Sequence, residues 1–155
     1  MSPADEWLIK YGRHHNHNAN RIIHSVTIPF VVMSLVGLLW SLPVPDAFNA
    51  ARPVLNWGTI FLMAASVYYF IMSISLAFGV LPLLAFVIFG IDWLQELDVP
   101  LWLSSAAILG ITWAGQRIGH QIEGQQPPLF EDIQTTMIGP VWLLANIYKR
   151  FGIPY

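Results

Sequence analysis

The sequence predicts an all-α membrane protein, a polytopic helical bundle with about four transmembrane helices and interfacial helices at its N- and C-terminal ends. Hydrophobic residues make up 55% of the 155 residues and charged residues only 10%, whereas soluble domains contain about 25% charged residues. A soluble protein this small could not bury so much apolar surface in its own core. Several apolar runs also approach the roughly 20 residues that a helix needs to cross a bilayer. We therefore expect one membrane-embedded domain over residues 1–155.

The N-terminal part contains a polar segment, one expected span and one loop. The first 20 residues are polar, with apolar side chains at helical spacing, as in a helix that lies at the membrane surface. From Ile22 to Leu42 the chain is apolar apart from His24 and a few hydroxyls, and these 21 residues suffice to cross a bilayer. Pro29 falls inside this run, which a transmembrane helix tolerates. Residues 43–52 contain two prolines, an aspartate and an arginine and predict a loop.

The middle of the chain predicts a helical hairpin. Residues 53–91 contain no Asp, Glu, Lys or Arg over 39 positions, and a single helix of that length would overshoot the membrane. Two helices fit if the chain turns at Gly79-Val80-Leu81-Pro82, because Gly and Pro favour turns. The expected helices are then Val54–Phe78 and Leu83–Leu94, followed by an acidic loop over residues 92–98.

The C-terminal part predicts a fourth span and a shorter helix. The apolar run from Pro100 to about Trp113 continues into a polar end that reaches Gly124. Residues 125–128, two glutamines and two prolines, then break the helix. The later apolar stretch Met137–Tyr148 is too short for a span. We expect it at the membrane interface or packed against the bundle.

Four spans place the two chain ends and the expected turn near Gly79 on one side of the membrane. Six of the seven basic residues then lie on that side. They are Lys10, Arg13, Arg21, Arg117, Lys149 and Arg150, against Arg52 on the other side. Because Lys and Arg gather in cytoplasmic loops, we expect the N- and C-termini in the cytoplasm. The membrane itself is either a bacterial inner membrane or the endoplasmic reticulum.

The same topology gathers all five histidines near the cytoplasmic face. They are His14, His15, His17, His24 and His120. This clustering predicts a shared site with cytoplasmic access. The net charge of −2 gives no reason to expect a nucleic-acid partner, and the absence of cysteine excludes disulfides and thiolate metal sites. Membrane lipid is the expected surrounding, and a homo-oligomer stays an open alternative to a monomer.

Two segments carry side chains suited to one site. Asn20 and His24 are four residues apart, so they share a face of one helix. Gln116, His120 and Glu123 follow an i, i+4, i+7 spacing and share a face of another helix. The imidazole and the carboxylate of this second set can point at one metal ion, as in helix bundles that hold iron or manganese. Imidazoles with a carboxylate suit non-haem Fe(II) that reacts with oxygen, and they equally suit zinc.

Simpler interpretations of these residues stay open. His14 and His17 suit a solvated loop, and His24 suits an ordinary interfacial position. Asn20 and Gln116 either orient metal ligands or cap helix ends. The alternatives to a redox enzyme are a zinc-dependent membrane lipid hydrolase and a non-catalytic membrane protein that binds lipid. A haem site with paired axial histidines is a further alternative.

Both segments resemble the signatures of the 2-hydroxy fatty acid dioxygenase family, membrane proteins of fatty-acid α-oxidation that were long grouped as a domain of unknown function. The N-terminal residues that carry the resemblance are Tyr11-Gly12, His15, Asn20, Ile23-His24 and Pro29. The C-terminal ones are Trp113-Ala114-Gly115-Gln116-Arg117-Ile118-Gly119-His120-Gln121-Ile122-Glu123-Gly124, then Pro127, Phe130-Glu131-Asp132 and Ile138-Gly139-Pro140. Residues 31–105 match in hydropathy only. Two positions depart from the pattern: Arg117 stands where an aromatic residue is expected, and His17 where asparagine is expected.

The resemblance implies an Fe(II)-dependent dioxygenase with O₂ as co-substrate. Its substrate is a long-chain 2-hydroxy fatty acid, and its product is the fatty acid one carbon shorter. The resemblance further implies that His15, His24 and His120 are iron ligands. Glu123 is then the fourth ligand or the hydrogen-bond acceptor of a ligating imidazole.

Four further residues take supporting roles in this interpretation. Asn20 and Gln116 support the ligands, and Arg21 or Arg117 pairs with the substrate carboxylate. The acyl tail lies between the helices, and the polar head lies at the cytoplasmic edge.

Overall fold

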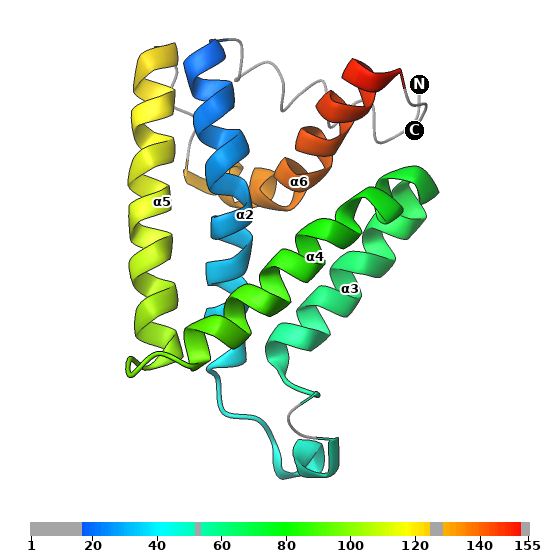
Figure 1. Ribbon diagram of the computed structural model, residues 1–155, viewed down its shortest axis with the longest axis vertical. Coiled ribbons are helices and arrows are strands. Elements are labelled where there is room, and N and C mark those ends of the chain that lie inside the picture. Colours follow the sequence, from blue (N-terminus) through cyan, green and yellow to red (C-terminus); the bar gives the residue numbers. More distant parts are fainter. Residues whose placement is uncertain (1–16, 52–53, 125–128, 153–155) are drawn as a thin grey trace.

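The computed structural model describes residues 17–51, 54–124 and 129–152, which form a bundle of helices with no strand among them (Figure 1). The elements are α2 (Asn18–Trp40), the short 3-10 helix η1 (Asp46–Ala51), α3 (Trp57–Met72), α4 (Ile74–Gln95), α5 (Leu101–Glu123) and α6 (Leu129–Phe151). The all-α class is therefore confirmed for this part of the chain. The surface helix expected near the N-terminus and the break at residues 125–128 lie outside the described residues.

Two of these helices, α2 and α4, are long and apolar enough to cross a membrane. Helix α3 is apolar but has only 16 residues. Helix α5 has 23 residues, but its second half carries Gln116 and Arg117, so it is less apolar than a typical span. By length and composition, the described residues therefore contain two candidate spans and not clearly the expected four.

The break between α3 and α4 falls at Ser73, so the expected turn at residues 79–82 is wrong. The Ser73 N–H ends α3 by donating to the Tyr69 carbonyl at 3.0 Å, and the Ser73 side chain begins α4 by accepting from the Leu76 N–H at 3.4 Å. Ser73 itself is extended, with φ −166° and ψ 130°. Pro82 lies inside α4 on an exposed face, which an apolar spanning helix tolerates.

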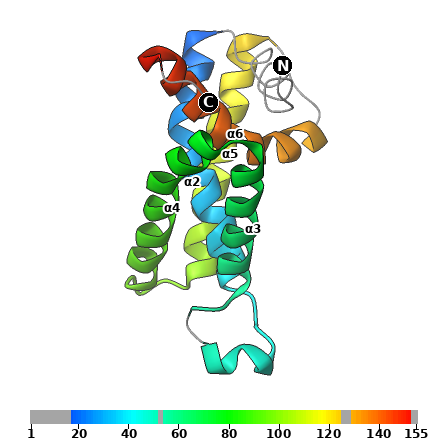
Figure 2. The same cartoon turned by 90° about the vertical axis from the view of Figure 1, so that its right-hand side faces the viewer.

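The helices lie in two pairs. Figure 1 shows α2 beside α5, and the view turned by 90° places α3 and α4 in front of that pair (Figure 2). The start of α2, the turn at Ser73 and the end of α5 lie toward one end of the bundle, whereas η1 and the connection from α4 to α5 lie at the other (Figure 1). Helix α6 lies across the gap between the upper parts of α2 and α4.

The pair α2 and α5 is antiparallel and closely packed. In order along α2, the residues in contact are Asn20 with Glu123, His24 with His120, Thr27 with Gln116, and Gly37 with Ser105. A Cβ atom at Gly37 would overlap the Ser105 hydroxyl and lie 3.2 Å from its Cβ. Small residues of this kind let two helix backbones approach each other, as they do in membrane bundles.

Two apolar clusters hold the other helices together, and one of them also joins these helices to α2. One cluster holds α3, α4 and α6 together and contains Tyr69, Leu76 and Trp142. The other joins α2, α3 and α4 through residues such as Val36, Leu62 and Ile91. Outside the clusters, many large apolar side chains are exposed, for example Ile71 at 79%, Ile111 at 74% and Phe89 at 71%. An exposed apolar surface on several helices suits contact with lipid.

Gly37→Val tests the close approach of α2 and α5. The larger side chain has no space against Ser105, so we expect a stability loss of about 1–3 kcal/mol. Gly110→Val is the matched control, because a Cβ at Gly110 meets no atom within 4 Å. The thermal unfolding midpoint in detergent measures both variants. Equal midpoints for the two variants would contradict the proposed packing.

Candidate functional site

Two buried imidazoles meet where α2 faces α5. His24 is 4% exposed and His120 is 2% exposed, and their ring centroids lie 4.7 Å apart with planes inclined by 63°. The two residues come from helices that are distant in the sequence, so the contact depends on the antiparallel packing. Imidazole nitrogens are common ligands of metal ions. The pair therefore has the chemistry of a ligand set.

A carboxylate and an amide lie next to this imidazole pair. The Asn20 side-chain amide donates a hydrogen bond to Glu123 Oε2, which joins the first turns of α2 to the last turn of α5. Asn20 is fully buried, whereas Glu123 is half-buried. Gly119 lies directly against the Asn20 amide, so that a Cβ atom there would overlap it. Asn20 thus fixes the position of the carboxylate that follows His120 by one turn.

Gln116 lies one turn on the other side of His120 and contacts α2. Its amide donates to Thr27 Oγ1 at 3.1 Å, and that hydroxyl in turn donates to the Ile23 carbonyl at 2.8 Å. Gln116 therefore joins the two helices one turn from the imidazole pair. Thr27 is a residue that the sequence interpretation missed. The signal for it was its spacing, because Thr27 follows Asn20 by seven residues and so shares its helical face.

The two arginines near the site contact tryptophan rings. The Arg21 guanidinium carbon lies 6.0 Å from the ring centroid of Trp142 on α6, and that of Arg117 lies 5.1 Å from the ring of Trp113. Arg21 is exposed, and Arg117 is half-buried. Contacts of this kind are typical of cation–π pairs. Arg21 therefore lies on the side of the site that α6 covers, and Arg117 lies along α5.

The described residues contain no group of three or more His, Asp or Glu side chains placed to hold a metal ion. They do supply two imidazoles and a nearby carboxylate, which is a donor set that fits iron or zinc in part. His15, the third expected ligand, lies outside the described residues, as does His14. His17 is exposed, and its Nδ1 accepts the Ala19 N–H at 3.2 Å, so it caps the start of α2.

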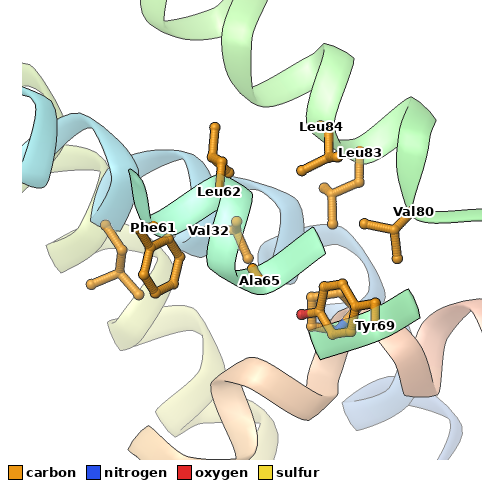
Figure 3. Close-up of a pocket in the computed structure, with 10 residues that line it drawn as sticks. Val32, Phe61, Leu62, Ala65, Tyr69, Val80, Leu83 and Leu84 are labelled. Atoms are coloured by element: carbon orange, nitrogen blue, oxygen red, sulfur yellow. The ribbon is translucent and has the colours of Figure 1, made fainter. Parts of the chain in front are cut away.

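An apolar cavity lies between α2, α3, α4 and α6, farther along α2 than the imidazole pair. Figure 3 shows its lining side chains, which come chiefly from the facing sides of α3 and α4. Its volume is about 30 Å³. Tyr69 and Val80 also line a second, more open groove of about 190 Å³ between α3 and α4. The lining of both spaces suits an apolar ligand rather than a polar one.

The fold and the site define a helical protein with two candidate membrane spans and a buried pair of histidines between two antiparallel helices. The family model of the 2-hydroxy-palmitic acid dioxygenase Mpo1-like proteins matches residues 1–151. The chain therefore belongs to that family, and the resemblance of its two terminal segments is confirmed. No curated protein and no solved structure matches the chain.

Asn20→Asp tests the hydrogen bond that holds Glu123. The substitution places a second carboxylate against the first in a buried position. We expect a loss of about 1–3 kcal/mol or more in stability, because a buried charged group loses its partner. Asn18→Asp is the control, since Asn18 is exposed two residues earlier on the same helix. Thermal unfolding compares the two, and an Asn20→Asp variant as stable as the control would rule out this role.

Proposed function

We propose that this protein is an Fe(II)-dependent dioxygenase that cleaves the C1–C2 bond of long-chain 2-hydroxy fatty acids. The observation that carries the proposal is the family match over residues 1–151, together with the buried histidine pair of the same chain. The family description names 2-hydroxy-palmitic acid and a dioxygenase activity. The amphiphilic substrate suits a protein with two candidate spans and an apolar exterior.

The proposed reaction balances without an external reductant. A 2-hydroxy acid and O₂ give the fatty acid one carbon shorter, carbon dioxide and water. The C1–C2 bond breaks, C2 gains one oxygen atom, C1 leaves as carbon dioxide with no net gain of oxygen, and water accounts for the second oxygen atom. The two carbons together lose four electrons, and O₂ accepts these four electrons. This balance matches the dioxygenase activity that the family description names.

His24 and His120 would hold the iron together with His15, and Glu123 would be the fourth ligand or the acceptor of an imidazole N–H. Bound Fe(II) would bind the hydroxyl oxygen and one carboxylate oxygen of the substrate and would activate O₂. Asn20 would support this ligand set without binding the metal. Asn20 holds the Glu123 carboxylate in place through its amide.

The substrate head lies at the end of the bundle where α2 begins and α5 ends. Arg21 and Arg117 are the cations of the described residues closest in sequence to the site, and a guanidinium suits a carboxylate. Arg21 is the better placed of the two, because it lies on the side that α6 covers, whereas Arg117 contacts a ring of its own helix. We further propose that four spans place this end of the bundle, with both termini, in the cytoplasm.

His24→Ala and His120→Ala test the iron site. Each variant loses an imidazole from the buried pair, so we expect a loss of bound iron and of conversion of 2-hydroxypalmitic acid to pentadecanoic acid. His17→Asn is the control, because His17 is exposed and asparagine also caps helices. Metal analysis of the purified proteins and product analysis measure both effects. Unchanged iron content in both alanine variants would remove the metal site from the proposal.

Isotope labelling tests the reaction class. With ¹⁸O₂, we expect the pentadecanoic acid product to contain one ¹⁸O atom, because C2 gains one oxygen atom from O₂ when the C1–C2 bond breaks. Mass spectrometry of the product measures the label, and the same reaction in H₂¹⁸O is the control. Activity that persists with zinc and without O₂ would instead identify a hydrolase.

A further inference from the structure

We propose that the apolar cavity between α2, α3, α4 and α6 binds the terminal carbons of the substrate's acyl chain and thereby sets its length. This inference rests on the proposed function, because that function supplies the acyl chain. The cavity lies on the α2 face that carries His24. Leu35, which lines it, follows His24 by three helical turns, about 16 Å along the axis.

The cavity has the chemistry that a hydrocarbon chain requires. Its lining includes Val32, Phe61, Leu62, Ala65, Tyr69 and Leu84, so that the Tyr69 hydroxyl is the single polar side-chain group. Figure 3 shows these side chains from α2, α3 and α4 around a common space. A cavity with a single polar side-chain group does not hold water well, because a buried water needs two to four polar partners, and the space therefore suits carbon atoms. Its volume of about 30 Å³ is too small for a whole chain and fits only its end.

Helix α6 borders both the cavity and the site. Pro140 of α6 lines the cavity, and Trp142, two residues later, contacts Arg21 beside the histidine pair. One helix therefore borders both the polar head position and the position of the chain end. The open groove on the other side of Tyr69 and Val80 leads outward, toward the exposed apolar surface of α3 and α4. A chain in the cavity would thus remain close to the lipid from which it came.

Phe61 and Ala65 both line the cavity and lie one helical turn apart on α3, with Ala65 nearer the C-terminal end of that helix. A larger side chain at Ala65 would fill the cavity, whereas a smaller one at Phe61 would extend it. Ala64 offers a matched control, because it precedes Ala65 on α3 but is exposed. Substitutions at the buried Ala65 and at the exposed Ala64 can therefore be compared to test whether position 65 determines substrate length.

The first experiment measures chain-length preference in the full-length protein. For Ala65→Phe, we expect kcat/KM for 2-hydroxypalmitic acid to fall about tenfold or more relative to 2-hydroxylauric acid, since a few methylenes lose their space. Phe61→Ala should shift the preference the other way, toward 2-hydroxystearic acid. Ala64→Phe should leave the profile unchanged. A folded Ala65→Phe or Phe61→Ala protein with the wild-type profile overturns the proposal.

The second experiment reads binding without turnover. A 2-hydroxy fatty acid with a diazirine at its terminal carbon is photolysed with the protein in the absence of O₂, and labelled peptides are mapped by mass spectrometry. We expect label on the cavity-lining parts of α3 and α4, competition by unlabelled 2-hydroxypalmitic acid, and loss of label in Ala65→Phe but not in Ala64→Phe. Equal labelling of the two variants overturns the proposal.

The two experiments separate this inference from the proposed function. A protein that labels at the cavity but forms no shortened acid contradicts the dioxygenase and supports the acyl site. If the protein is active but Ala65→Phe changes neither the labelling nor the chain-length preference, the dioxygenase is supported and the acyl site is overturned.

Discussion

The close antiparallel packing of α2 against α5 is the contact on which the rest of the structure depends. Within a bilayer, helices gain little from burying apolar surface against each other, because lipid is equally apolar. Association then depends on packing and on hydrogen bonds between helices. This pair has both, with Gly37 against Ser105 near one end and the amides of Asn20 and Gln116 near the other. The register of this packing places His24 opposite His120.

Two hydrogen bonds between α2 and α5 lie on either side of the histidine pair. Gln116 donates to Thr27 on the apolar side of the imidazoles, and Asn20 donates to Glu123 on the side where the helix pair ends. Polar groups of this kind interact more strongly in surroundings of low dielectric constant. A shift of either helix by one turn would separate both pairs at once. The imidazoles therefore keep their mutual position although 95 residues of chain lie between them.

The sequence predicted the helical class and the shared faces of Asn20 with His24 and of Gln116 with His120, because helical periodicity depends only on spacing. It could not predict that these two faces meet, since that depends on packing over the whole length of both helices. Thr27 was missed because a hydroxyl in an apolar helix can be satisfied by its own helix carbonyl. The turn was misplaced because Pro82 suggested a break, whereas the Ser73 side chain that caps α4 is a weaker signal.

Helix α6 gives the site and the apolar cavity a common wall. Trp142 lies beside Arg21 at the head of α2, and Pro140 lines the cavity deeper in the bundle. Farther along, the Tyr148 hydroxyl donates to the Ser75 carbonyl at 2.9 Å and lies against Gly79, where a side chain would overlap it. Glycine at position 79 therefore serves the approach of α6 rather than a turn. Because α6 contacts α4 and borders both spaces, the shape of the site and that of the cavity depend on the position of the same helix.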